Sequence, residues 1–200
     1  ASQPCKIESD SAGKTWPRRG NGLLMLAALG YYYAQLRQAQ TKRDKPPRGD
    51  HIERAIRLSE LPAGAEILCV GARNAQEPLA FLERGYRAVG LDILPSVHPA
   101  MRWGDFHRLP FGAGRFDLVY AVHVYEHARD IAAAAREATR VLKPDGFLYA
   151  VFPIGFVPSG HDLVDFGSPE GFLRWFPGLQ RVWSRETPTE AAVLGRRFGP

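Results

Sequence analysis

The sequence predicts an α/β fold: a Rossmann-like, seven-stranded and mostly parallel sheet, with helices on both faces and a C-terminal antiparallel hairpin. The first observation is that short apolar runs alternate with helical segments through residues 51–178. This alternation is typical of parallel sheets whose strands are joined by helices. The second observation is that the first run is followed at once by a glycine and the second run ends in a carboxylate, as in nucleotide-binding strand-helix-strand units.

The first half of the predicted domain contains two helices and three strands. A helical stripe of apolar residues follows Asp50, which we expect to cap that helix. Gly85 is expected to end the second helix. In chain order, the expected elements are a helix at 51–60, a strand at 67–70, a helix at 76–84, a strand at 88–92 and a weaker strand at 100–103.

The second half continues the same pattern and then changes direction. Residues 143–146 read as a Pro/Gly turn, and Ser168 is expected to cap a short helix. The expected elements are a strand at 116–122, a helix at 130–142, a strand at 147–152, a short helix from 169, and strands at 179–186 and 191–198. The last two strands are close enough in sequence to pair as the antiparallel hairpin.

The charge distribution separates a basic N-terminal arm at 1–50 from a domain at 51–200. The arm contains nine Lys/Arg and four Asp/Glu, whereas the rest of the chain holds seventeen of each. A basic arm can contact nucleic acid, anionic lipid or an acidic partner protein, or it can be a solvated tail. A charged linker at 41–50, rich in Pro, marks the boundary.

The arm also contains an apolar segment, residues 22–36, for which three alternatives stay open. It is a helix packed on the domain or on a partner protein, a short or tilted membrane anchor, or a helix lying in a membrane interface. The segment is shorter than the roughly 20 apolar residues of an ordinary membrane span. Tyr31, Tyr32 and Tyr33 cover every face of a helix, which argues against a simple one-sided amphipathic helix.

Three residues follow strand ends and indicate a nucleoside-binding site. Gly71 lets the chain turn tightly and lets a ligand approach the backbone. A full G-x-G-x-x-G is missing, so the pyrophosphate cradle of NAD and FAD enzymes is not expected. Asp92 can accept hydrogen bonds from both ribose hydroxyls, and Asp105 can accept a hydrogen bond from the amino group of an adenine. Ordinary turn and capping roles are the structural alternatives for these three residues.

Five blocks in order resemble the class I S-adenosylmethionine-dependent methyltransferases, especially small members with a G-x-R-N-x-x-E first loop. The blocks are ILCVGARNAQE, YRAVGLDILP, GDFHRLPF, RFDLVYAVHVYEH and ATRVLKPDGFLYAVFP. The resemblance covers roughly residues 50–198 and implies S-adenosylmethionine as the cofactor. It does not name the methyl acceptor.

The resemblance also implies which residues hold the cofactor. Asp92 would bind the ribose, Asp105 the adenine amino group, and His123 would lie beside the methionine part. Arg73, Asn74 and Glu77 replace the second and third glycines of the usual loop, and either Arg73 or Asn74 could contact the methionine carboxylate. The full set implied is Gly71, Arg73, Asn74, Asp92, Ile93, Asp105, Phe106 and His123.

The catalytic candidates are His123 and His127. Their spacing would place both on one face of a helix and would suit a metal, but no third ligand is apparent, so we expect no metal site. A general-base role is the alternative, needed only where the acceptor must lose a proton. The loop at 161–162 would overhang the acceptor side, although it also reads as an ordinary polar surface loop.

The block after the fourth strand also limits the acceptor. Related enzymes that methylate amines of nucleic acid or protein often carry Asn/Asp-Pro-Pro-Tyr here, whereas this chain has His-Val-Tyr-Glu at 123–126. Nucleic acid is therefore not expected as a partner.

Two functions are consistent with these features. The first is an active S-adenosylmethionine-dependent methyltransferase of unknown acceptor. The alternative is a methyltransferase-like accessory or structural subunit without turnover, which reaches a larger, membrane-bound (mitochondrial) complex through residues 1–50. The variant first loop, the missing substrate-binding insertion and the apolar segment of the arm favour this alternative.

Cysteine usage and the first residue bear on location. Cys5 and Cys69 form no CxxC pair or Cys/His cluster, which fits a reducing, intracellular compartment. The chain begins at Ala1 rather than Met, so a cleaved organellar presequence, and with it a mitochondrial location, is an expectation that the sequence leaves untested.

Overall fold

A computed structural model describes residues 22–42 and 49–199 of the chain. Seven strands build one sheet: β1 (Glu66–Val70), β2 (Arg87–Asp92), β3 (Met101–Trp103), β4 (Phe116–Val122), β5 (Leu142–Pro153), β6 (Leu179–Glu186) and β7 (Glu190–Arg197). Their order across the sheet is β3-β2-β1-β4-β5-β7-β6. Strands β1 to β5 pair in parallel, whereas β7 is antiparallel to both β5 and β6. The predicted fold class, including the C-terminal hairpin, is confirmed.

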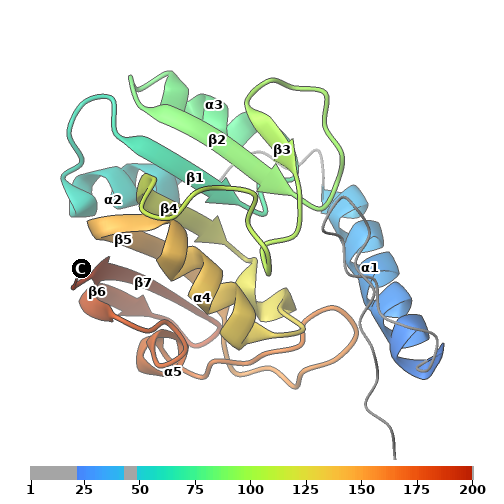
Figure 1. The fold of residues 1–200 in the computed structure, drawn as a ribbon. Coiled ribbons are helices and arrows are strands. Elements are labelled where there is room, and N and C mark those ends of the chain that lie inside the picture. The colour runs from blue at the N-terminus through green and yellow to red at the C-terminus, as the bar shows by residue number, and fades with distance from the viewer. Residues whose placement is uncertain (1–21, 43–48, 200) are drawn as a thin grey trace, which may run out of the picture.

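Helices cover both faces of the sheet (Figure 1). The described helices are α1 (Gly22–Lys42), α2 (Gly49–Ser59), α3 (Gln76–Leu82), the 3₁₀ helix η1 (Tyr125–His127), α4 (Ile131–Val141) and α5 (Pro169–Leu173). Of these, α1 lies beyond the ends of the strands rather than on a face. Ile52 of α2 and Phe81 of α3 belong to one buried apolar cluster, and Ala135 of α4 and Phe172 of α5 belong to the other. Because alternate residues of a buried strand point to opposite faces, each central strand supplies both clusters.

The element boundaries differ from expectation at two places. Asp50 does not cap α2, because that helix begins at Gly49 and Asp50 lies in its first turn. Residues 143–146 are not a turn outside the sheet but part of β5. Asp145 has a φ of 63°, and the pairing of β4 with β5 shifts register nearby, so the extra residues are absorbed as a bulge. Ser168 caps α5 as predicted, accepting a hydrogen bond from the Gly171 N–H at 3.0 Å.

Helix α1 packs on the domain at the carboxyl ends of the parallel strands (Figure 1). The Tyr31 hydroxyl donates a hydrogen bond to the His127 carbonyl oxygen at 2.8 Å. The Gln35 side-chain amide donates to the His161 carbonyl oxygen at 3.0 Å. These contacts correspond to the first of the three alternatives for residues 22–36, a helix packed on protein.

The remaining predictions about the arm concern residues that are only partly described. In the part of the chain that the structure covers, no helix combines the length and the apolarity of a membrane span. Residues 1–21 and most of the linker, 43–48, lie outside the described residues. The predicted contact of residues 1–50 with a partner protein stays a prediction.

Candidate functional site

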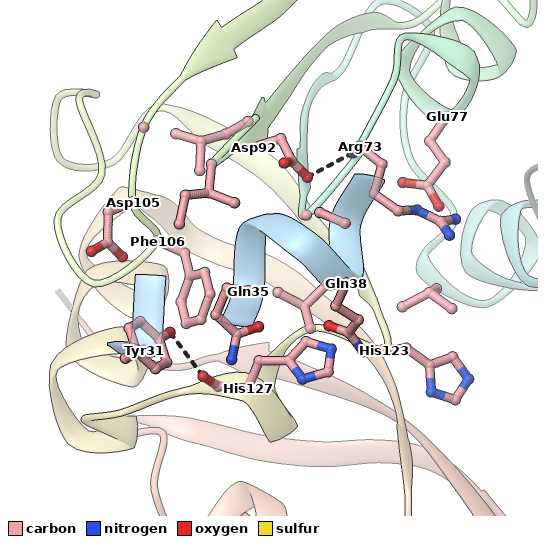
Figure 2. A pocket seen from close by; sticks show the side chains of 17 residues that line it. Tyr31, Gln35, Gln38, Arg73, Glu77, Asp92, Asp105, Phe106, His123 and His127 are labelled. Carbon is pink, nitrogen blue, oxygen red and sulfur yellow. Dashed lines mark hydrogen bonds between the residues drawn. The ribbon is translucent and has the colours of Figure 1, made fainter. Parts of the chain in front are cut away.

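A cavity of about 600 Å³ opens at the carboxyl ends of β1, β2 and β4, with α1 along one side (Figure 2). Its size lies within the range of small-molecule and cofactor sites, roughly 300–1,000 Å³. Most of the predicted site residues line it: Gly71, Arg73, Asp92, Ile93, Asp105, Phe106, His123 and His127. One loop, two strand ends and the turn after β4 are therefore brought to a single place, as expected for this kind of sheet.

Gly71 is required by the protein's own packing as well as by its backbone conformation. Its φ is 67°, in the region that favours glycine. A Cβ atom at this position would lie 2.5 Å from Cγ2 of Val124, which belongs to the turn after β4. The glycine therefore lets the first loop and the fourth-strand turn meet at the wall of the cavity.

Asn74 does not contribute to the cavity as the structure describes it. Its side-chain oxygen instead accepts a hydrogen bond from the Gln76 N–H at 3.1 Å, at the start of α3. Asparagine readily makes such local contacts two residues along the chain. Of the two loop residues predicted to contact the methionine carboxylate, only Arg73 faces the cavity.

Asp92 is a buried carboxylate fixed by backbone donors. Its Oδ2 accepts from the Arg73 N–H and its Oδ1 from the Leu94 N–H, both at 2.7 Å. Burial raises the pKa of Asp92, and these backbone hydrogen bonds oppose the rise. The side chain is only 4% exposed yet lines the cavity (Figure 2). It is a rigid acceptor at the end of β2, where ribose hydroxyls are expected.

Asp105 is engaged more heavily than the sequence suggests. His107 donates to Oδ1 from its backbone N–H at 2.9 Å, and its ring Nδ1 lies 2.5 Å from the same oxygen. The Tyr32 hydroxyl of α1 donates to Oδ2 at 2.5 Å. Burial alone would raise the pKa of Asp105, but these hydrogen bonds outweigh it and hold the pKa well below its usual range. An adenine amino group would have to share Oδ2 with Tyr32.

Glu77 lines the cavity, although the sequence identified it only as a replacement for one of the usual glycines. It lies in the first turn of α3, is 5% exposed and lines the cavity. Burial raises the pKa of Glu77 to about 7; Arg73 opposes the shift and Asp92 adds to it. The first loop therefore presents an ionisable carboxyl beside a guanidinium.

Of the two catalytic candidates, His123 lies on the side of the cavity away from Asp105, and His127 lies between them, beside Tyr31 (Figure 2). His123 Nε2 is 3.0 Å from Glu190 Oε2, and its Nδ1 is 3.4 Å from Glu126 Oε1. His123 has a φ of 55° and precedes η1, so the two histidines are not an i, i+4 pair on one helix. They nevertheless both reach the cavity.

His127 is tied to the loop after β5. Its Nδ1 lies 2.9 Å from the His161 carbonyl oxygen and 3.0 Å from Asp162 Oδ1. The loop at 161–162 therefore contacts a residue that lines the cavity. The His161 carbonyl oxygen also accepts a hydrogen bond from the Gln35 side-chain amide of α1. Helix α1, η1 and the loop after β5 therefore meet at this point.

Helix α1 supplies part of the cavity wall, which the sequence does not predict. Tyr31, Gln35 and Gln38 lie beside His127 and His123 in Figure 2, and Ala39 completes this side. The Gln38 side-chain nitrogen is buried and has no hydrogen-bond partner among the described residues. A spacing of apolar residues cannot indicate which cavity a helix will cover, so no sequence signal marks these positions.

Comparison with known proteins relates part of the chain to a protein family. Residues 68–150 match the family model described as a methyltransferase domain. This match covers 83 of the 200 residues and supports a methyltransferase domain in this part of the chain. The matched range includes the first loop, the ends of β2 and β4, and both catalytic candidates.

Individual relatives of this methyltransferase domain extend the comparison. A ubiquinone biosynthesis O-methyltransferase of Methylobacterium sp. (strain 4-46) is 30% identical over 145 residues, which cover 56% of this chain and 57% of the relative. The chain thus spans about half the length of the curated relatives that it matches.

Solved structures agree on the fold. The Burkholderia thailandensis 1,6-didemethyltoxoflavin-N1-methyltransferase, with bound 1,6-didemethyltoxoflavin and S-adenosylhomocysteine, has a TM-score of 0.70 at 18% identity and covers 93% of this chain and 94% of that chain. The YcgJ protein of Bacillus subtilis has a TM-score of 0.62 at 15% identity, covering 76% and 100%. At these identities the likeness concerns the fold alone.

Proposed function

We propose that the protein is an S-adenosylmethionine-dependent methyltransferase that acts on a small acceptor entering the cavity. The observation that carries the proposal is the cavity of about 600 Å³ beyond Gly71 and Asp92, which the protein's own side chains leave open. A degenerate, purely structural domain would be expected to fill this space with side chains, because empty interior volume is destabilising.

The residues present fit the cofactor class. Asp92 would accept the ribose hydroxyls, and Ile93 and Phe106 offer apolar surface to the adenine. Arg73 would pair with the methionine carboxylate, and the Glu77 carboxyl, which lines the same cavity, would pair with the methionine ammonium group. When bound, S-adenosylmethionine supplies a methyl group on a sulfonium, which a nucleophile must approach in line. The chain's part is to bind, orient and exclude water.

His123 and His127 remain the proposed catalytic residues. Both line the cavity, where the acceptor would meet the methyl group. We assign proton removal from the acceptor heteroatom to His123, whose ring is held by Glu190 and Glu126. His127 is joined to the loop at 161–162 and would shape the acceptor end.

Isothermal titration of the purified chain with S-adenosylmethionine and S-adenosylhomocysteine tests the proposal. We expect saturable binding, weakened about 10- to 100-fold by Asp92→Asn, because a hydrogen bond to a charged group is worth about 1.5–3 kcal/mol. Asp145→Asn is the matched control, since Asp145 is exposed and pairs with Arg196 far from β2. Absence of binding at millimolar cofactor would overturn the proposal.

The accessory-subunit alternative keeps its own test. It predicts that residues 1–50 bind a partner protein, and residues 1–21 lie outside the described part of the chain. Purification of the native protein under mild conditions would decide it: a lone monomer that binds cofactor and turns over counts against the alternative.

A further inference from the structure

Glu126, His127 and Asp162 form a cluster of polar groups next to the cavity, which His127 lines. Each side chain offers one atom of the kind that binds metal ions, and these atoms all lie within 4.8 Å of one another. Glu126 and His127 belong to η1, whereas Asp162 belongs to the loop after β5. No third ligand is apparent in the sequence because Asp162 is remote along the chain and reaches the site only through the fold.

Glu126 gives an independent indication that something binds here. Its side chain is 2% exposed, and its Oε2 has no hydrogen-bond partner among the described residues. Its other oxygen, Oε1, is 3.4 Å from His123 Nδ1 and 3.8 Å from His127 Nε2. A buried carboxylate oxygen without a donor is costly, and a cation is the partner that removes the cost most directly.

The backbone holds the three side chains in register. The N–H groups of Leu163 and Val164 both donate to the Glu126 carbonyl oxygen, at 2.7 and 3.0 Å. Asp162 also closes a tight turn with Ser159, with a backbone hydrogen bond of 2.8 Å. The loop is thus fastened to η1 next to its acidic side chain, and Asp162 Oδ1 lies 3.0 Å from His127 Nδ1. A site built in this way loses little entropy when an ion binds.

We propose that Glu126, His127 and Asp162 bind a divalent transition-metal ion of the Zn²⁺ or Mn²⁺ class. Two carboxylates and one imidazole are suitable ligands for such ions, and their two negative charges balance a dication. Three protein ligands would leave further coordination positions for water or an acceptor oxygen, and His127 would connect the site to the cavity that it lines. An acceptor oxygen bound there would be polarised and oriented beside the proposed methyl donor.

The competing explanation is a metal-free network in which His127 contacts the two carboxylates directly. Both explanations use the same contacts, but they predict different responses to added metal. The metal site is tested without cofactor, so its failure would leave the proposed methyltransferase function untouched.

The experiment is a metal titration of the purified chain after removal of metal with EDTA. ZnCl₂ is followed by calorimetry, and MnCl₂ by the loss of the free-ion electron paramagnetic resonance signal. We expect one site with a micromolar Kd, weakened at least tenfold in Asp162→Asn and in Glu126→Gln. Asp145→Asn, an exposed aspartate elsewhere, should bind like the wild type.

Two results would overturn the proposal. One is wild-type binding weaker than millimolar for both ions. The other is equal affinity in the wild type and in Asp162→Asn. The Asp162 side chain is 37% exposed and asparagine is polar and isosteric with it, so we expect this variant to fold. Circular dichroism of each variant checks that the fold is kept, and Asp162→Asn carries the test if Glu126→Gln does not fold.

Discussion

Glu77 shows how burial changes the chemistry of a single residue. Burial raises its pKa from 4.5 to about 7, and the folded state therefore binds a proton more tightly than the unfolded chain. The resulting stabilisation is complete below pH ~4.5, the unfolded value, and is lost as the pH rises through 7. On the scale of about 1.4 kcal/mol per pKa unit, the loss is on the order of 3 kcal/mol.

The test compares wild type and Glu77→Gln by urea unfolding at pH 5 and pH 8. We expect the free energy of unfolding of the wild type to fall relative to that of Glu77→Gln as the pH rises, because glutamine cannot ionise. Glu83→Gln, at an exposed position of the same segment, should follow the wild type. Parallel pH dependence of wild type and Glu77→Gln would show that Glu77 ionises normally.

Gly71 is required both by its positive φ and by its close approach to Val124. Gly85, which has a positive φ but open space around it, allows the two contributions to be separated. Gly71→Ala should cost about 3 kcal/mol, combining left-handed backbone strain of about 1–2 kcal/mol with overpacking against Val124. Gly85 has a φ of 83°, but a Cβ added there would meet nothing within 4 Å, so Gly85→Ala should show the backbone cost alone. Equal losses in thermal unfolding for the two variants would contradict the role given to Val124.

At the scale of elements, α1 links the arm to the cofactor site through Tyr32 and Asp105. The Tyr32 hydroxyl donates a hydrogen bond to Asp105 Oδ2, so it would compete with the adenine amino group that we propose for that oxygen. We expect Tyr32→Phe to tighten S-adenosylhomocysteine binding about 2- to 10-fold, the equivalent of one hydrogen bond of about 0.5–1.5 kcal/mol.

Titration calorimetry on Tyr32→Phe and Tyr33→Phe provides the comparison. Tyr33 is the adjacent residue and is 66% exposed, so its substitution should leave the affinity unchanged. Weaker binding in Tyr32→Phe would mean that the hydroxyl organises the adenine site rather than competing for it.

The same scale explains which elements are predictable. The strands and helices of 51–200 can be located because buried strands and amphipathic helices leave a periodic record in the sequence. The bulge in β5 resembles a turn in sequence, since Pro and Gly mark both features. The sequence left three alternatives for the position of α1, because the pattern of an apolar helix does not indicate which surface the helix will cover.

For the molecule as a whole, the order of strands in the sheet determines where the candidate site lies. Parallel strands β1, β2 and β4 end at one edge, so residues that follow them in sequence meet there. This rule accounts for the position of Gly71, Asp92 and His123 around one cavity. It does not account for Asn74, whose side chain turns to a local backbone donor instead.

The sequence by itself predicted the α/β class, the resemblance to methyltransferases and the strand-end residues that line the cavity, because these follow from periodicity and from motifs within short stretches of chain. Only the tertiary structure decided that α1 forms a wall of the cavity and that the Tyr32 hydroxyl donates a hydrogen bond to Asp105. It also decided that Asp162 lies next to Glu126 and His127. These contacts join residues remote in sequence, and their formation depends on the packing of whole elements rather than on any local preference.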